Sequence, residues 1–295
     1  MRLGIQLPEV ERIVRWPEYR SLAISAEESG FDSVWLGDHL VYRDGGRERG
    51  PWEAWTMLAA LAGVTRRVVL GPLVACLGFH PPAVLAKMAA TIDEISEGRF
   101  VLGVGAGWNR PEFDAFGIPY DRRVARFAEA YHVVQPLVTG GRATVHGDFV
   151  DVDDAVLLPP MQRAVPIMVG SNGRRMLELT LPSADIWNTW FSEFGNTAEG
   201  FARRNAFVDQ VAASVARDPA TIERSACVLV ITDPTSDERV PSEGVTPIDG
   251  SPAQVASGIA EIVDAGADEV IIVVGPIDER SIRSLAETVA ILRGS

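Results

Sequence analysis

The sequence predicts an α/β protein whose parallel strands close into a (β/α)8 TIM barrel with insertion segments. Apolar, strand-like runs alternate with amphipathic helical patterns along most of the chain. Most of these runs are continuously apolar, as is typical of strands buried on both faces. There are eight of them, and eight alternating units favour a closed barrel over an open doubly wound sheet. In order, the expected strands are Arg2–Leu7, Ser33–Gly37, Val68–Val74, Phe100–Val104, Pro166–Val169, Ala184–Trp187, Ala226–Ile231 and Glu269–Val274.

The clearest strand–helix–strand unit lies between Arg67 and Phe113. Apolar residues recur at helical spacing from Ala83 to Ile95, and Gly98 follows as a stop signal. The second strand of the unit ends in a turn that contains Gly103, Gly105 and Gly107. Glycines at the carboxyl end of a parallel strand would let a flat ligand approach the backbone, and the alternative is a loop that needs positive φ.

A length of 295 residues with 47% hydrophobic composition fits one barrel domain over residues 1–295. Two segments interrupt the alternation. Residues 142–160 have the pattern of a β-hairpin that turns near His146. Residues 233–250 are rich in Pro, Ser, Thr, Asp and Glu and predict a loop.

The formal net charge of −13 argues against nucleic acid and anionic membranes as partners. No apolar run is long enough to span a bilayer, and the first residues lack a signal-peptide pattern. The two cysteines, Cys76 and Cys227, lie in separate apolar runs, which disfavours a disulfide framework. These features predict a cytoplasmic protein, and no motif has metal-ligand spacing.

Asp38 and His39 come directly after the second expected strand. In a barrel this is the catalytic rim, where His39 could transfer a proton. The alternative is structural: Asp38 caps the next segment and His39 is an ordinary loop histidine.

The segment from Gly170 to Met176 forms a polar turn between a strand and a helix. Its backbone N–H groups, together with Ser171 and Asn172, predict a phosphate cradle. A plain helix cap by Ser171 or Asn172 is the alternative. Beyond the next strand, Asn188 and Trp190 could line a pocket, and His80 could contact a ligand near the rim.

The chain resembles the bacterial luciferase-like flavin and deazaflavin oxidoreductases over nearly its whole length. The resemblance is carried by GFDSVWLGDH at residues 30–39, LGPLV at 70–74 and HPPAVLAKMAATIDEISEGRFVLGVGAGW at 80–108. It continues in VPIMVGSNG at 165–173 and ADIWN at 184–188.

The resemblance implies a barrel that binds FMN or the 5-deazaflavin coenzyme F420 in its mouth. It places the ring against a bulge at Leu73 and Val74, a bond that is often a non-prolyl cis peptide in deazaflavin-using members. It implies that the phosphate lies on Gly170, Ser171, Asn172 and Gly173, that Ala106 and Asn109 contact the cofactor, and that Asp38 and His39 contact ring and substrate. The best-known deazaflavin-dependent dehydrogenases carry a glutamate at the position of Ala106. Its absence here argues against a sugar-phosphate or alcohol dehydrogenase that depends on this glutamate.

Three functions follow as hypotheses. The leading one is an F420-dependent oxidoreductase that transfers a hydride between the deazaflavin C5 and a small organic substrate, with His39 transferring the proton and Asp38 orienting or tuning His39. The alternative is an FMN-dependent luciferase-like monooxygenase that uses reduced flavin and oxygen. A third is a cofactor carrier without catalysis. A homodimer is expected because apolar helices such as 52–62 could bury surface between subunits.

Overall fold

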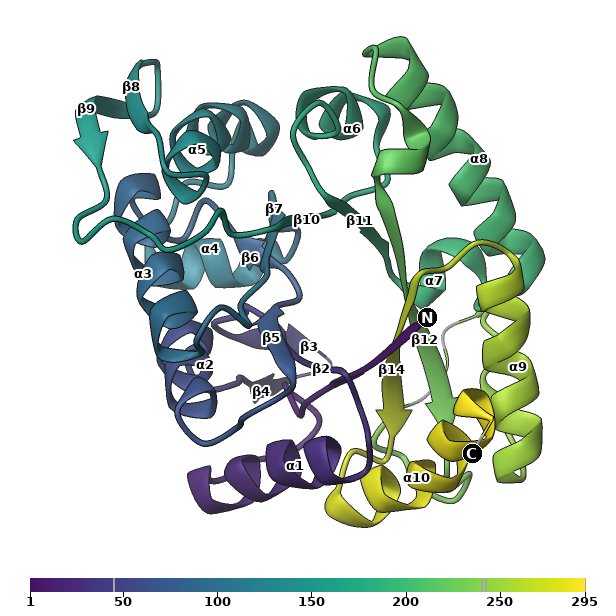
Figure 1. Cartoon of the computed structure of the whole chain (residues 1–295). Coiled ribbons are helices and arrows are strands. Elements are labelled where there is room, and N and C mark those ends of the chain that lie inside the picture. Colours follow the sequence, from purple (N-terminus) through teal and green to yellow (C-terminus); the bar gives the residue numbers. More distant parts are fainter. Residues whose placement is uncertain (45, 240, 242, 295) are drawn as a thin grey trace.

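The structure, a computed structural model, describes residues 1–44, 46–239, 241 and 243–294. Eight parallel strands in this part of the chain form a ring, and helices surround it (Figure 1). Each observed ring strand overlaps one of the eight predicted strands, so the predicted sequence of strands is confirmed. They are β1 (Arg2–Gln6), β2 (Ser33–Leu36), β5 (Val69–Pro72), β7 (Leu102–Gly105), β10 (Ile167–Gly170), β11 (Ile186–Thr189), β12 (Glu223–Ile231) and β14 (Glu269–Gly275).

The ring is a closed barrel. Hydrogen-bonded neighbours run from β5 through β2, β1, β14, β12, β11 and β10 to β7. The two ends of this path meet at Leu70, whose N–H donates to the carbonyl of Arg99 and whose carbonyl accepts from the N–H of Val101, both at 3.0 Å. The predicted (β/α)8 fold class is therefore confirmed. This order places β1 and β2 across the ring from β10 and β11.

The helices cover the outside of the ring (Figure 1). Helix α3 begins after Pro81 and ends at Ile95 as predicted, and a capping box between Ser251 and Gln254 starts helix α9. The helices are α1 (Trp16–Glu28), α2 (Ala54–Ala62), α3 (Pro82–Ile95), α4 (Arg110–Phe116), α5 (Arg123–Val138), α6 (Arg174–Thr180), α7 (Phe191–Phe194), α8 (Ala198–Ser214), α9 (Pro252–Asp264) and α10 (Glu279–Arg293), with a 3₁₀ turn at Pro219–Thr221.

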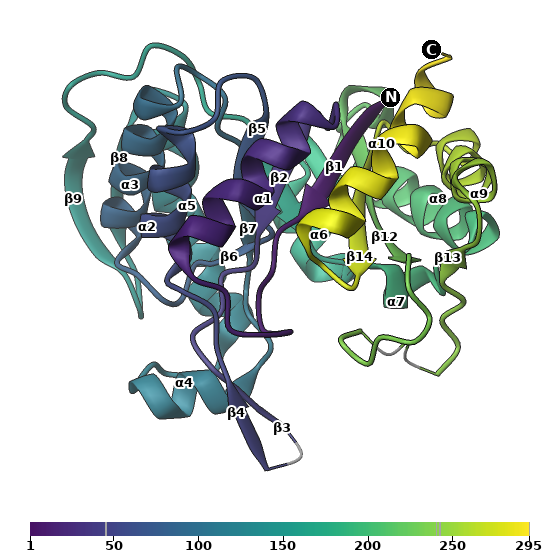
Figure 2. The same ribbon diagram turned by 90° about the horizontal axis from the view of Figure 1, so that it is seen from below.

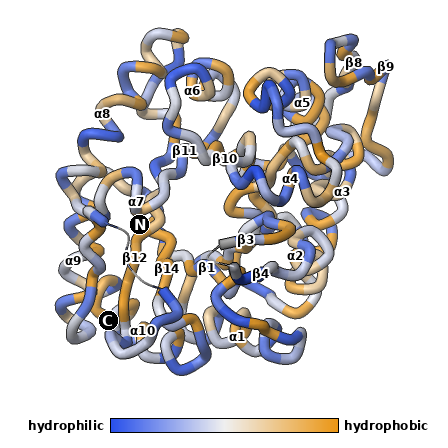
Figure 3. The backbone as a smooth tube through the Cα atoms, turned by 180° about the vertical axis from the view of Figure 1, so that it is seen from behind, coloured by the Kyte–Doolittle hydropathy of each residue, from blue (hydrophilic) through white to orange (hydrophobic). Residues whose placement is uncertain are grey.

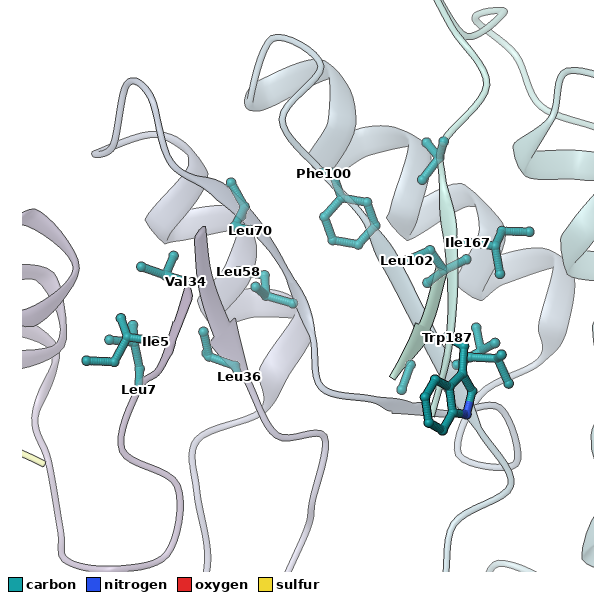
Figure 4. Close-up of a cluster of buried hydrophobic side chains, with 14 of the residues drawn as sticks. Ile5, Leu7, Val34, Leu36, Leu58, Leu70, Phe100, Leu102, Ile167 and Trp187 are labelled. Atoms are coloured by element: carbon teal, nitrogen blue, oxygen red, sulfur yellow. The ribbon is translucent and has the colours of Figure 1, made fainter. Parts of the chain in front are cut away.

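Buried apolar side chains pack on both faces of the strands, which explains the continuously apolar runs. The larger cluster lies between strands and helices; Figure 4 shows Ile5, Val34, Phe100 and Trp187 among its members. A smaller cluster fills the inside of the barrel with Trp35, Val101, Met168, Ile186, Cys227, Leu229, Ile271 and Val273. Hydropathy along the chain agrees with this arrangement. Strands β12 and β14 are strongly hydrophobic, whereas hydrophobic and hydrophilic residues alternate along the outer helices (Figure 3).

Short segments extend the barrel at several connections. The predicted hairpin exists as β8 (Arg142–His146) paired antiparallel with β9 (Asp151–Val156). An unpredicted hairpin, β3 (Tyr42–Asp44) with β4 (Arg47–Arg49), follows β2, and it projects with α4 from one end of the molecule (Figure 2). Strand β6 (Ala75–Cys76) adds to β7, and β13 (Ile248–Asp249), from the predicted 233–250 loop, adds to β12. Val240 and Ser242 of that loop lie outside the described residues.

Candidate active site

A cavity of about 670 Å³ opens at the carboxyl ends of the barrel strands. Its wall comes from the segments that follow β1, β2, β5, β7, β10 and β11, as parallel α/β folds require of a ligand site. Asn188 and Trp190, expected to line a pocket, contribute to it. Most of the predicted site residues also line it: Asp38, His39, Leu73, Val74, Ala106, Gly170, Ser171 and Asn172.

The cavity floor is built around Val74. The peptide bond between Leu73 and Val74 is cis, as the family resemblance implied. A Cβ added at Gly103 or Gly170 would lie 2.9 Å from a Val74 methyl, and one at Gly105 would lie 2.8 Å from a Val74 methyl. These glycines are therefore needed for close packing against Val74. Only Gly107 of the glycine turn has positive φ, at 73°.

His39 is held by a carboxylate that the sequence did not single out. The imidazole Nδ1 lies 3.0 Å from Oε1 of Glu112, which is on α4. The other Glu112 oxygen accepts the backbone N–H of Leu40 at 2.9 Å. The Glu112 side chain is 1% exposed and that of His39 is 15% exposed. Glu112 therefore fixes both the ring of His39 and the chain that follows it.

A second carboxylate, Glu9, faces the opposite side of His39. Its Oε1 lies 3.7 Å from the imidazole Nε2 and accepts the hydroxyl of Tyr42 at 3.0 Å. Its Oε2 accepts the Gln6 amide at 3.0 Å. Arg239, from the 233–250 segment, donates to the amide oxygen of Gln6 at 3.1 Å and orients it. One histidine thus lies between two buried carboxylates.

This arrangement changes the proton affinities of its members. Burial raises the pKa of Glu9, although His39 and Arg239 oppose the increase. For His39, burial lowers the pKa, but Glu112 and Glu9 together outweigh burial and raise it. The imidazole therefore stays protonated to higher pH than a free histidine, as an ion paired with carboxylates.

Asp38 is one of the charges that raise the pKa of His39, but its own hydrogen bond is made elsewhere. Its carboxylate accepts the backbone N–H of Cys76 at 2.9 Å, and the residue is 5% exposed. It caps no following helix, so the structural alternative is not found either. Burial raises the pKa of Asp38 to about 7. The orientation of His39 is instead fixed by Glu112, which lies 73 residues away in the sequence.

The opposite side of the cavity carries polar groups that lack partners. Among the described residues, Nε of Arg123 and Oδ1 of Asn172 have no hydrogen-bond partner. Oγ1 of Thr189, a residue that is 1% exposed, also has none. All three residues line the cavity. Such atoms are uncommon in folded proteins, and these three are candidates for contact with a ligand in the cavity.

Ser171 and Asn172 do not act as helix caps. The residue in the cap position of α6 is Gly173, and no side chain caps this helix. Sequence reasoning named this turn but missed Arg123, which begins α5 and stacks on Tyr120 with its guanidinium carbon 4.2 Å from the ring centroid. No motif marked Arg123, because it reaches the turn only through the fold.

Three expected contact residues lie elsewhere. The Asn109 amide donates to the carbonyl of Val41 at 2.8 Å and is 6% exposed, outside the cavity wall. Gly173 is also absent from the wall. The ring of His80 packs against the edge of Trp55 at 6.1 Å between centroids, away from the cavity.

Known proteins match this chain both by sequence and by structure. The family model described as luciferase-like monooxygenase matches residues 2–241. A pyrimidine monooxygenase, RutA, from Methylorubrum extorquens is 32% identical over 74% of this chain and 60% of its own length. An F420-dependent secondary alcohol dehydrogenase has a TM-score of 0.83 at 20% identity, over 99% of both chains. Monooxygenase RslO1 from Streptomyces bottropensis has a TM-score of 0.77 at 23% identity, also over 99% of both chains.

A TIM barrel with a rim histidine and a cavity built on Val74 defines a luciferase-like protein, and the match of the family model shows that this chain belongs to the luciferase-like monooxygenase family. The chain spans about 60% of the length of the curated relative from Methylorubrum extorquens. Within the described residues, no helix is long and apolar enough to cross a bilayer, and no group of His, Cys, Asp and Glu is arranged to hold a metal ion.

Replacing Asp38 with asparagine will flatten the pH dependence of stability. Because the folded-state pKa is about 7, against 3.8 for an ordinary aspartate, the folded chain keeps a proton that the unfolded chain releases between these values. This stabilisation, of about 4 kcal/mol at most, is present at acid pH and disappears as the pH rises through 7. Urea unfolding at pH of about 5 and about 8 should therefore show Asp38→Asn gaining stability relative to the wild type as pH rises. Exposed Asp264→Asn is the control, and parallel profiles would contradict the prediction.

Replacing Glu112 with glutamine will lower the pKa of His39. The charge that favours the imidazolium disappears while the burial that opposes it remains. The pKa is measured from the imidazole signals in an NMR titration of the protein. Glu193→Gln serves as the matched control, since Glu193 lines the cavity but is not among the groups that shift His39. An unchanged His39 pKa in Glu112→Gln would show that the contact is not electrostatically significant.

Proposed function

We propose that this protein is an FMN-dependent monooxygenase that acts on a small organic molecule. The observation that carries the proposal is the sequence similarity to pyrimidine monooxygenases, at 32% identity over 74% of the chain. The leading hypothesis from sequence was an F420-dependent oxidoreductase. Its support is now weaker than that of the FMN alternative, because the F420-dependent neighbour is only 20% identical and shares the fold alone.

The residues that line the cavity fit the phosphate end of FMN. Arg123 offers a guanidinium whose Nε lacks a partner within the described chain, and Ser171 and Asn172 border the same space. Arginine pairs well with phosphate because its planar fork of donors matches the phosphate oxygens. The helix behind the turn, α6, has only seven residues, so the charge of Arg123 is expected to matter more than the helix dipole.

Reduced FMN, when bound, supplies the electrons with which one atom of O₂ enters the substrate and the other leaves as water. The protein's share is to position the reactants and to move protons. His39 is suited to hold a proton at Nε2, because Glu112 occupies Nδ1 and raises the pKa of the ring. Glu9 lies 3.7 Å from Nε2, close enough to compensate the charge of the imidazolium. This distance is too long for a hydrogen bond, so the N–H at Nε2 stays free to donate to a reactant.

A cofactor titration with an oxygen assay tests the proposal. Purified protein is titrated with FMN and with F420, and oxygen consumption is then followed with chemically reduced FMN. FMN binding, with oxygen consumption above that of free reduced flavin when candidate substrates are added, is the expected result. Binding of F420 without binding of FMN would overturn the proposal in favour of the deazaflavin reading. Binding of either cofactor without turnover of any substrate would favour a carrier.

Replacing Arg123 with glutamine should weaken the binding of FMN at least about tenfold and leave the binding of riboflavin nearly unchanged, because only FMN carries the phosphate. Quenching of flavin fluorescence measures both affinities. Arg126→Gln is the matched control: Arg126 lies on the same helix, but its guanidinium sits over Phe149 rather than in the cavity. Equal losses for FMN and riboflavin would show that Arg123 shapes the site instead of binding phosphate.

A further inference from the structure

The cavity has two sides of opposite character. The segments after β1 and β2 bring the carboxyl groups of Glu9 and Asp38 to one side, and α4 adds Glu112. The segments after β10 and β11 form the other side, across the ring, with Ser171 and Thr189. Arg123 also lines the cavity, which therefore combines this carboxyl-rich side with a cation suited to phosphate.

The imidazolium on the carboxyl-rich side is already compensated. His39 has Glu112 at 3.0 Å from Nδ1 and Glu9 at 3.7 Å from Nε2. An anionic ligand would therefore meet more carboxyl than imidazolium charge. The distance from Nε2 to Glu9 is too long for a hydrogen bond, so this nitrogen can still donate to a neutral acceptor.

Aromatic rings lie next to these groups, tilted or edge-to-face relative to one another. The centroid of His39 lies 4.7 Å from that of Tyr42 and 5.7 Å from that of Trp108. Trp108 is 62% exposed although it lines the cavity. A large aromatic surface left open to solvent in a cavity is typical of a ligand-stacking position.

A buried hydroxyl indicates that the cavity is completed by a ligand. Thr189 is 1% exposed, and its Oγ1 has no hydrogen-bond partner among the described residues. A hydroxyl both donates and accepts, so a carbonyl or amide can satisfy it. This observation does not depend on the carboxyl groups across the ring.

We propose that the substrate is a planar, uncharged ring with a carbonyl acceptor, of the amide or lactam type, and that the carboxyl-rich side of the cavity excludes carboxylates. The proposal rests on the proposed monooxygenase function and defines its substrate class. The ring stacks on the exposed indole of Trp108, and its carbonyl accepts from Nε2 of His39.

Exclusion of anions follows from electrostatics in a partly buried site. A ligand carboxylate within several ångströms of Glu9, Asp38 and Glu112 is repelled by whichever of them is ionised. If the side-chain carboxylates instead take up protons when the ligand binds, the free energy of that protonation reduces the affinity for the ligand carboxylate. Like-charge juxtaposition is a common way to reject an unwanted partner, and the matched neutral ligand escapes it.

Benzamide and benzoate test the proposal, because they share one planar shape and differ in charge. Their dissociation constants for the FMN-loaded protein are measured by ligand-observed NMR at pH of about 7. We expect benzamide to bind at least about tenfold more tightly than benzoate. Benzoate binding equal to or tighter than benzamide, or no binding of benzamide in the millimolar range, would overturn the proposal. FMN binding is measured separately on the same sample, so failure of the cofactor assignment is distinguished from failure of the substrate class.

A charge-removing variant tests whether the carboxyl groups cause the discrimination. Glu9→Gln keeps the shape of the side chain and removes its charge. It should strengthen benzoate binding, and so reduce the preference for benzamide over benzoate several-fold. Glu261→Gln, on the exposed face of α9, removes the same charge outside the cavity and should leave the ratio unchanged. Thermal melting and FMN affinity establish that both variants are folded. An unchanged ratio in folded Glu9→Gln, or equal narrowing in Glu261→Gln, would contradict the proposal.

Discussion

Closure of the barrel between β5 and β7 is the constraint on which the site depends. Two glycines permit it. A Cβ at Gly71 would lie 2.2 Å from the carbonyl oxygen of Val101, and a Cβ at Gly103 would lie 2.2 Å from that of Pro72. Any larger residue would hold the two strands apart. Because they can approach, Leu70 bonds to Arg99 and Val101, and the ring of parallel strands is complete.

Closure also builds the floor of the cavity. Just beyond β5, the chain turns inward at Val74, whose methyl groups occupy the space left by Gly105 and Gly170 on two other strands. The same backbone approach that closes the ring thus places an apolar residue beneath the ligand space. Inside the barrel, buried polar groups stay satisfied, as in the contact of Ser33 with Glu269 at 2.7 Å.

The rim combines groups that could not act alone. A buried histidine is expected to lose its charge, and a buried glutamate is expected to gain a proton. Placing His39 between Glu112 and Glu9 favours the imidazolium, so the ring keeps its proton although it is largely buried. Buried ion pairs contribute little to stability on balance because desolvation opposes them. Their retention agrees with the proton chemistry proposed at Nε2 and with the proposed selectivity among ligands.

The sequence by itself determined the barrel, the order of its strands and the insertion at 142–160. These depend on local patterns: continuous apolar runs, helical spacing from Ala83 to Ile95, and turn residues that interrupt both. It also located Asp38, His39 and the Ser171 turn, because residues that follow parallel strands must meet at one end of the barrel. The family motifs added the cis bond at Leu73, which no local pattern predicts.

Only the tertiary structure decided which side chains meet at that end. Glu9, Glu112 and Arg123 carry no motif, and Glu112 reaches His39 across 73 residues of sequence. The structure also removed Asn109 from the cavity wall, since its amide is used by the carbonyl of Val41. Proton affinities follow the same rule, because burial and charge at Asp38 and His39 come from neighbours distant in sequence. Local sequence fixes backbone patterns, whereas contacts between loops depend on the curvature and closure of the whole sheet.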